Sequence, residues 1–98
     1  MTIHSKDYGT HVKFELRNGP LVLCEMKAIR VGEDFVIDHI ETDAEYRRRG
    51  YAQELVSRLS TFVGNPVIVM SILPGAEPFW DRMEAQGWAK IDNSAKPQ

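Results

Sequence analysis

Residues 36–63 read VIDHIETDAEYRRRGYAQELVSRLSTFV, and this stretch decides which fold the sequence predicts. Its beginning is mainly apolar and predicts a strand over residues 35–41. A tight basic turn over residues 42–49 follows this strand. After Gly50, apolar residues recur in steps of three and four, which predicts an amphipathic helix that begins near this glycine. The apolar positions of this helix are Ala52, Leu55, Val56, Leu59, Phe62 and Val63.

The start of this predicted helix has the chemistry of an anion site. The first turn of a helix has free N–H groups and carries the positive end of the helix dipole. Gly50 would let a phosphate approach the backbone closely, and the arginines at positions 47–49 add charge and forked donors. These residues leave two interpretations open. One is a site for a phosphorylated ligand such as a pyrophosphate, and the other is a solvated helix start with surface arginines.

Residues 47–52, RRRGYA, fit the pattern Arg/Gln-x-x-Gly-x-Gly/Ala. This resembles the acyl-CoA-binding motif of the GNAT superfamily of acetyl-CoA-dependent N-acyltransferases. The preceding residues 40–47, IETDAEYR, look like the strand end and turn that come before the motif in that family. The resemblance covers roughly residues 12–91 and is firmest over residues 35–88, because the motif lies between a strand and an amphipathic helix.

Two strands are predicted before this stretch, and they form an antiparallel meander with its strand. Apolar and charged residues alternate over residues 11–17, which is typical of a half-buried strand. Asn18 and Gly19 form a strong hairpin signal that leads into a partner strand over residues 21–29. A further turn then connects this partner to the strand at residues 35–41.

Another strand, helix and strand are predicted after the stretch. The first helix, over about residues 48–63, stops at residues 64–66, GNP. The β-branched run at residues 67–72 predicts a strand buried on both faces, which the helical crossover makes parallel to the strand before it. A second amphipathic helix ends at Gly87, and residues 88–91 predict a short final strand.

The predicted fold class is therefore α+β, with a mixed, mostly antiparallel central sheet and two helices. The order of elements is β-β-β-α-β-α-β, which is GNAT-like. The 98 residues predict a single domain, in which residues 1–10 and 93–98 are expected to be flexible polar ends. GNAT proteins usually open with a strand and two helices that wall the acceptor site, and only residues 1–10 precede the first predicted strand. The resemblance thus implies an acceptor pocket that a protein acceptor, or a second copy in a homodimer, would complete.

Composition narrows the classes of function. The chain has 12 Lys and Arg, 14 Asp and Glu, and a net charge of −2, which does not favour nucleic-acid binding. No apolar run approaches the length of a membrane span, and the start MTIHSKDYG does not read as a signal peptide. Cys24 is the single cysteine, so an internal disulfide is impossible. The sequence predicts a cytoplasmic protein with a buried thiol, without a membrane partner and without a metal.

The resemblance implies acetyl-CoA as co-substrate and implies which residues contact it. In the family, pantetheine lies between the strand at residues 35–41 and the strand that follows the helix. The pyrophosphate meets backbone N–H groups of the motif. The implied contact residues are Ile40, Glu41, Thr42, Arg47, Arg48, Arg49, Gly50, Tyr51, Ala52, Ser71 and Phe79.

The catalytic base remains open among Asp38, Glu41 and His39. Strict alternation along the strand puts Asp38 on a face with Ile40, and puts His39 on the other face with Glu41. Asp38 falls at a position where related enzymes often carry a base. Many family members also place a tyrosine on the second helix as the acid that reprotonates the CoA thiolate. Trp80 stands near that place and cannot act as an acid at neutral pH.

Two functions of different classes follow from these expectations. The first is an N-acetyltransferase that moves an acetyl group from acetyl-CoA to a primary amine, a lysine or the N-terminal amine of a protein, by direct attack in a ternary complex. The alternative is a catalytically weak GNAT-like module that binds a protein partner, or CoA without turnover. Gly50 and Ala52 favour the first function, because a pure interaction domain would not need them.

Overall fold

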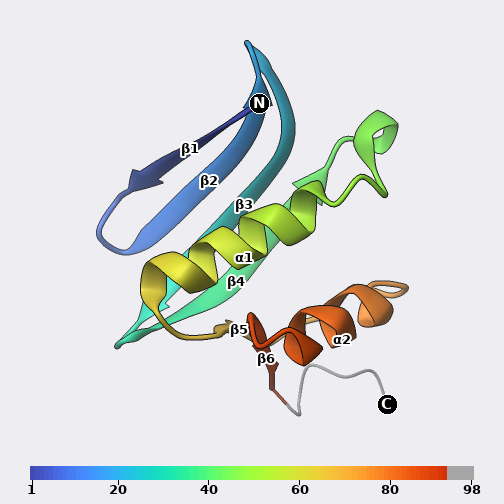
Figure 1. The fold of residues 1–98 in the computed structure, drawn as a ribbon. Helices are drawn as coiled ribbons and strands as arrows, with labels where there is room; N and C mark the ends of the chain where they lie inside the picture. Colours follow the sequence, from blue (N-terminus) through green and yellow to red (C-terminus); the bar gives the residue numbers. More distant parts are fainter. Residues whose placement is uncertain (93–98) are drawn as a thin grey trace.

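The computed structural model describes residues 1–92, so the expectation of a flexible end at residues 93–98 lies outside the described residues. Figure 1 shows a single sheet with helices on one of its faces. The elements in chain order are β1 (Thr2–Asp7), β2 (His11–Asn18), β3 (Leu21–Val31), β4 (Asp34–Thr42), the 3₁₀ helix η1 (Ala44–Tyr46), α1 (Tyr51–Val63), β5 (Val67–Val69), α2 (Glu77–Ala85) and β6 (Ala89–Ile91).

The strands lie in the sheet in the same order as in the chain, from β1 to β6. The pairs from β1 to β4 are antiparallel, and β5 and β6 continue the sheet in parallel with β4. Both parallel connections advance in the same direction, and right-handed crossovers therefore bring α1 and α2 to the same face. Figure 1 shows this placement. The predicted α+β class, the antiparallel meander and the parallel strand after the first helix are confirmed.

Alternation along the strands explains how the core forms. In β2 the residues Val12, Phe14 and Leu16 are buried, and the charged residues between them are half-buried. The apolar stripe of α1 meets the buried face of the sheet with Leu55 and Leu59, which are fully buried. Phe62 was expected on that stripe, but it is 65% exposed and touches only the edge of the core, with its ring 6.4 Å from that of Phe14.

β1 is the main departure from the expected order of elements. Residues 1–10 were expected to be a flexible polar end, but Thr2–Asp7 pairs antiparallel with β2 along its whole length. Its side chains are exposed except for the half-buried Ile3, so hydropathy gave no signal of a strand. Backbone pairing with the edge of β2 forms this element, because an exposed strand edge offers a row of free donors and acceptors.

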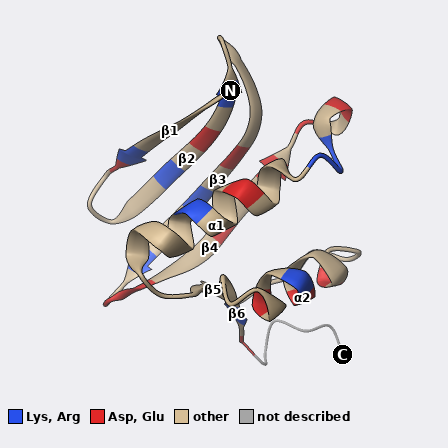
Figure 2. Ribbon diagram, viewed as in Figure 1, with Lys and Arg blue, Asp and Glu red and all other residues tan. Residues whose placement is uncertain are grey.

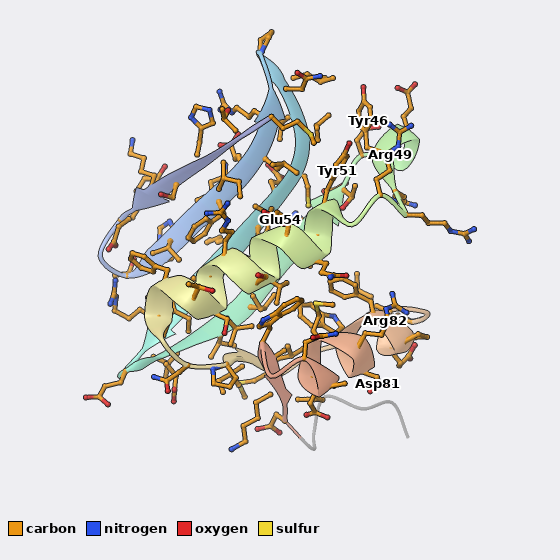
Figure 3. The ribbon with its side chains drawn as sticks, viewed as in Figure 1. Tyr46, Arg49, Tyr51, Glu54, Asp81 and Arg82 are labelled. Atoms are coloured by element: carbon orange, nitrogen blue, oxygen red, sulfur yellow. The ribbon has the colours of Figure 1, made fainter. Side chains whose placement is uncertain are left out.

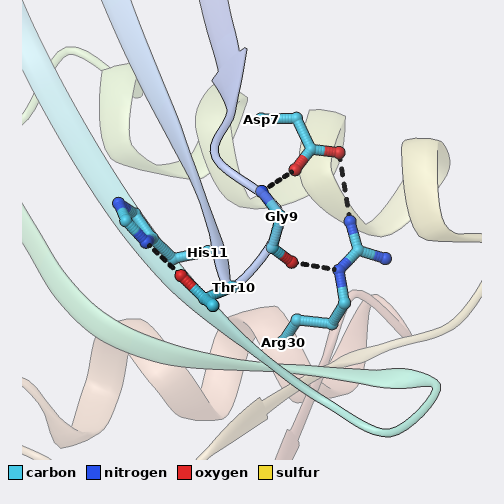
Figure 4. Close-up of polar contacts among 5 residues, drawn as sticks. All are labelled: Asp7, Gly9, Thr10, His11 and Arg30. Carbon is cyan, nitrogen blue, oxygen red and sulfur yellow. Dashed lines mark hydrogen bonds and ion pairs between the residues drawn. The ribbon is translucent and has the colours of Figure 1, made fainter.

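Arg30 of β3 holds the turn between β1 and β2 (Figure 4). Its guanidinium donates to the Gly9 carbonyl at 3.0 Å and to an Asp7 carboxylate oxygen at 3.1 Å. The other carboxylate oxygen of Asp7 accepts the N–H of Gly9 at 2.8 Å. The turn also contains a contact of 3.0 Å between the Thr10 hydroxyl and Nδ1 of His11. A side chain from the third strand therefore closes the first hairpin.

The second face of the sheet is not covered by any helix of residues 1–92 (Figure 1). Charged side chains project from this face, among them Lys13, Glu25 and Lys27. In the register of β2, β3 and β4, these residues lie opposite other polar residues. Within the described residues, neither helix combines the length and the apolar character needed to cross a bilayer.

Candidate functional site

The strands β4 and β5 separate soon after they meet. Their register contains one pair, Val36 with Ile68, and β5 ends at Val69 while β4 continues to Thr42. The sequence predicted a strand over residues 67–72, and this length was wrong. The apolar run alone could not reveal that β5 turns away from its partner, so Met70 and its neighbours have no strand to pair with. The edge of β4 beyond Val36 is consequently open toward this gap.

A β-bulge in β4 changes which side chains share a face. His39 pairs with Lys27, and Ile37 pairs with Ala28, so Asp38 has no partner across the ladder. Ile37 and Ile40 both pack against the core as a result. The expectation that Asp38 shares the face of Ile40 by strict alternation is therefore wrong, because the extra residue resets the alternation.

The turn between β4 and α1 has an unusual backbone. Arg48 has φ 65° and Gly50 has φ 81°, both in the left-handed region. Such angles cannot continue a helix, which is why α1 begins at Tyr51 and not near residue 48 as predicted. Gly50 is the N-cap of α1, and no side chain caps it. The first N–H groups of α1 therefore have no side-chain acceptor and remain available to an anion.

Polar contacts hold the first half of this turn. The Asp43 carboxylate caps η1 by accepting the N–H of Glu45 at 3.1 Å. Nε of Arg47 donates to the Thr42 carbonyl at 3.3 Å. These contacts draw the turn back over the end of β4, so the arginines lie around the start of α1, as the basic segment in Figure 2 shows.

A cavity of about 430 Å³ opens beside the start of α1, and we call it the turn cavity. One wall is the turn with the first residues of α1, and the other wall is the α2 pair Phe79 and Arg82. Its lining contains arginines and no carboxylate, so the cavity is electropositive. The lining residues are Thr42, Tyr46, Arg47, Arg48, Gly50, Tyr51, Ala52, Gln53, Phe79 and Arg82.

Most of the residues that the resemblance implied for cofactor binding meet at the turn cavity. Seven of them line it: Thr42, Arg47, Arg48, Gly50, Tyr51, Ala52 and Phe79. Arg49 lies on the other flank of α1, where it lines a second cavity of about 480 Å³ and its guanidinium lies 5.6 Å from the centre of the Tyr46 ring (Figure 3). Ile40, Glu41 and Ser71 do not line the turn cavity. Ile40 and Glu41 belong to the open part of β4, and Ser71 is exposed beyond β5.

Sequence reasoning missed Tyr46, Gln53 and Arg82 in this lining. A signal existed for Arg82, because it follows Phe79 by three positions, and such positions share a helix face. That helix carries Trp80 and Met83 into the core, with exposures of 4% and 1%. The burial of these two residues turns Phe79 and Arg82 toward the cavity.

The three candidate bases differ in their surroundings. The carboxylate of Asp38 lies 3.8 Å from Nζ of Lys27. Nε2 of His39 lies between two carboxylates, 3.6 Å from Glu25 and 3.4 Å from Glu41. All of these side chains belong to the uncovered face of the sheet. His39 and Glu41 are therefore in direct contact, whereas Asp38 has a different ionic partner.

Glu25, His39 and Glu41 also satisfy the spacing of metal ligands, since one ligand atom from each falls within 4.8 Å of the others. An imidazole with two carboxylates suits a divalent cation. Glu25 is half-buried, however, and the other two residues are exposed, a situation that is common without a metal.

Cys24 is a buried thiol, as predicted, with 1% exposure. Burial raises the pKa of the Cys24 thiol. The Thr42 hydroxyl, which donates to Sγ at 3.3 Å, opposes this effect, and the negative charge of Glu25 adds to it. A thiol that is protonated at neutral pH is a poor nucleophile. Cys24 is therefore part of the packing beneath the end of β4.

The fold is similar to that of solved structures. No protein-family model matches the chain, and no curated protein matches it in sequence. The ribosomal-protein-S18-alanine N-acetyltransferase from Escherichia coli superposes with a TM-score of 0.68 at 15% identity, over 83% of this chain and 54% of that one. A structure assigned to the GNAT family of acetyltransferases, from Bacteroides thetaiotaomicron, gives 0.55 at 18% identity, over 81% and 45%. The chain thus spans about half the length of these neighbours, and the resemblance inferred from the sequence is confirmed at the level of fold.

Proposed function

We propose that this chain, whose fold is GNAT-like, is an acetyl-CoA-dependent N-acetyltransferase. It moves an acetyl group from acetyl-CoA to a primary amine, a lysine or the N-terminal amine of a protein, by direct attack in a ternary complex. The observation that carries the proposal is the turn cavity. It combines an uncapped helix start, left-handed backbone at Arg48 and Gly50, and arginines without an acidic neighbour in the lining.

The proposed position of acetyl-CoA follows from the positive charges of the turn and from the gap between β4 and β5. The pyrophosphate of acetyl-CoA takes the N–H groups of residues 48–52, beside the guanidinium groups of Arg47 and Arg48. Arg49, on the other flank of α1, contributes to the positive potential but not to the lining. The small side chain of Ala52 leaves the start of the helix accessible, and the rings of Tyr51 and Phe79 supply apolar contact area.

Pantetheine then follows the open edge of β4 into the gap beside β5. Ile40, Glu41 and Thr42 supply backbone groups along that edge, and a backbone N–H there stabilises the oxyanion of the tetrahedral intermediate. Ser71, beyond the end of β5, lies on the other side of the gap and supplies a hydroxyl. Binding in this way brings the thioester to the middle of β4, where the bulge at Asp38 interrupts the ladder.

The acceptor amine approaches from the uncovered face of the sheet. The amine must lose a proton to attack the thioester carbonyl, and the candidates to accept it are Asp38, His39 and Glu41. His39 is the candidate with the most support from geometry, because its Nε2 lies 3.6 Å from a Glu25 carboxylate oxygen and 3.4 Å from a Glu41 carboxylate oxygen, and these contacts orient the ring. Collapse of the intermediate breaks the C–S bond, and solvent water reprotonates the CoA thiolate.

A protein acceptor fits this face because it is broad and carries charges of both signs. The Escherichia coli neighbour is, by its title, a ribosomal-protein-S18-alanine N-acetyltransferase, and this supports an amine on a protein as the acceptor class. A second copy in a homodimer could wall the same face. We further propose that the protein acts in the cytoplasm, where acetyl-CoA and reduced thiols occur together.

One observation favours a second candidate function, a GNAT-like module that binds CoA or a protein partner without turnover. Trp80 is 4% exposed and packs against Phe79, with ring centres 4.8 Å apart. It is near the position at which related enzymes carry a tyrosine that serves as the acid, and an indole N–H does not donate its proton at neutral pH.

Calorimetric titration with acetyl-CoA, followed by mass spectrometry of acetylated peptides, separates these functions. Tight one-to-one binding should weaken about ten- to hundred-fold in Arg48→Ala, because a charge-assisted hydrogen bond to phosphate is lost. Arg58→Ala removes the same charge from the exposed side of α1 and should bind normally. Binding with acetyl transfer supports the enzyme, and binding without transfer to any lysine or N-terminal peptide supports the module. If acetyl-CoA does not bind to the folded wild-type protein, both CoA-dependent functions are wrong.

A further inference from the structure

Arg82 forms a basic wall opposite the phosphate-binding turn. It belongs to α2, an element separate from the motif, and extends from that helix toward the α1 side, while its neighbour Asp81 lies on the other side of α2 (Figure 3). Phe79, one turn earlier, lines the cavity beside it. Since Trp80 and Met83 anchor the helix in the core, packing fixes the place on α2 from which the exposed Arg82 side chain extends.

The guanidinium of Arg82 has no protein partner among residues 1–92, where its side chain makes neither an ion pair nor a hydrogen bond. The nearby acidic residue Glu84 does have a partner, since its carboxylate accepts the N–H of Ile91 at 3.0 Å. Arg82 lies in the last turn of α2, where a cation also interacts favourably with the helix dipole. That interaction is compatible with a ligand, because it leaves the donors of the guanidinium free.

The charges of the ligand exceed those that the turn can neutralise. In the proposed complex, the helix start and the arginines at positions 47 and 48 meet the diphosphate. CoA carries a third phosphate on the 3′-hydroxyl of its ribose, and a phosphate monoester has a charge of about −1.5 to −2 at pH 7. This group extends away from the diphosphate on the side of the nucleoside, and a planar guanidinium with forked donors matches its oxygens.

We propose that Arg82 binds the 3′-phosphate of CoA and makes the site specific for 3′-phosphorylated CoA thioesters over their dephospho forms. The inference rests on the proposed function, because it assumes that the diphosphate lies at the turn. Arg82 thereby becomes a specificity-determining residue, contributed by the second helix to a site that the sequence motif assigns only to the first.

The test uses calorimetry to measure the affinities of two ligands for the wild-type protein and for the Arg82→Ala variant. Wild-type protein should bind acetyl-CoA at least about tenfold more tightly than acetyl-dephospho-CoA, as expected for a charge-assisted hydrogen bond. Arg82→Ala should bind both ligands with the affinity that wild type has for the dephospho form. Arg82→Lys should recover part of the preference, and Lys90→Ala, which removes an exposed cation from β6, should keep all of it.

Each result separates the inference from the proposed function. Two results would show that Arg82 does not recognise the 3′-phosphate, while the proposed cofactor site would keep its support. Wild type would bind both ligands with equal affinity, or Arg82→Ala would lower the affinity for both ligands by the same factor. If Arg48→Ala, and not Arg82→Ala, abolishes the preference for acetyl-CoA over acetyl-dephospho-CoA, the residue that recognises the 3′-phosphate is on the turn and the inference is wrong. If neither ligand binds to wild type, the proposed function itself fails. Circular dichroism of every variant verifies that loss of binding is not loss of fold.

Discussion

Gly50 and Gly64 cap the two ends of α1 and have almost the same backbone angle, φ 81° and φ 80°. A Cβ atom added at either position would meet nothing within 4 Å. Substitution there is therefore opposed by backbone strain and not by crowding. The two glycines differ in what lies next to them. Gly50 lines the turn cavity, whereas Gly64 ends the helix by donating its N–H to the Ser60 carbonyl.

This pair yields a matched prediction. Gly50→Ala and Gly64→Ala should each lower the free energy of unfolding by about 1 kcal/mol, because an L-residue in the left-handed region is strained. Gly50→Ala alone should weaken acetyl-CoA binding, since its methyl group would stand where a phosphate approaches the backbone. Urea denaturation and calorimetry measure the two effects. Equal loss of affinity in both variants would show that Gly50 has a structural role only.

Arg48 illustrates strain at a single residue that is not glycine. Its φ of 65° costs about 1–2 kcal/mol for a side chain with a Cβ atom. No partner within residues 1–92 compensates for this strain through its side chain. Strained backbone of this kind concentrates at ligand sites, where a bound anion offsets the cost. The geometry of Arg48 thus agrees with the ligand-binding role proposed for the turn.

At the scale of elements, β1 depends on one cross-strand side chain. Arg30 contacts the turn between β1 and β2 through Asp7 and the Gly9 carbonyl, as Figure 4 shows. β1 itself buries little, since its half-buried apolar residue is Ile3. The stability of this strand therefore rests on backbone pairing and on the contacts of Arg30.

Replacement of Arg30 by alanine should consequently loosen β1 without unfolding the domain. The expected loss of global stability is about 0.2–1 kcal/mol, because the side chain is 40% exposed and solvent screens its ion pair. Amide hydrogen exchange in Thr2–Asp7 should accelerate more than exchange in β3. Lys90→Ala, which removes an exposed cation from β6 at the opposite edge of the sheet, is the control and should leave the exchange of β1 unchanged. Uniform acceleration across the sheet would contradict this account.

For the whole molecule, one core joins the described elements. Buried residues from β2 to β6 and from both helices form a single cluster, and Ile3 of β1 packs against it. A single cluster predicts one cooperative domain. Leu59 lies at the centre of α1 and is fully buried, whereas Phe62 on the same helix is 65% exposed.

Leu59→Ala should therefore lower the free energy of unfolding by about 2–5 kcal/mol, a large share of the stability of a small domain. Phe62→Ala should cost less than about 1 kcal/mol, because most of its ring stays in water. Far-UV circular dichroism and the fluorescence of Trp80 and Trp88 report on different parts of the fold. Their transitions should coincide in every variant, and separate midpoints would contradict a single domain.

Much of the fold could be predicted from the chain alone, because its signals are local. Alternation in β2, the hairpin at Asn18 and Gly19, and the apolar stripe around Leu55 and Leu59 each lie within a few residues. The residues that form the turn between β4 and α1 could be identified for the same reason, since the glycine, the arginines and the helix start are adjacent in the chain.

Other features depend on contacts between distant segments, and local patterns could not predict them. β1 forms because the edge of β2 is free, and β5 is short because it turns away from β4 after Val69. The bulge at Asp38 arises from the pairing of β4 with β3, and it determines that His39 meets Glu25 and Glu41. Arg82 reaches the turn cavity only because Trp80 and Met83 dock α2 against the sheet. The first wall of the turn cavity is thus determined by adjacent residues, while its second wall and the arrangement of the candidate bases exist only once the sheet and both helices have packed together.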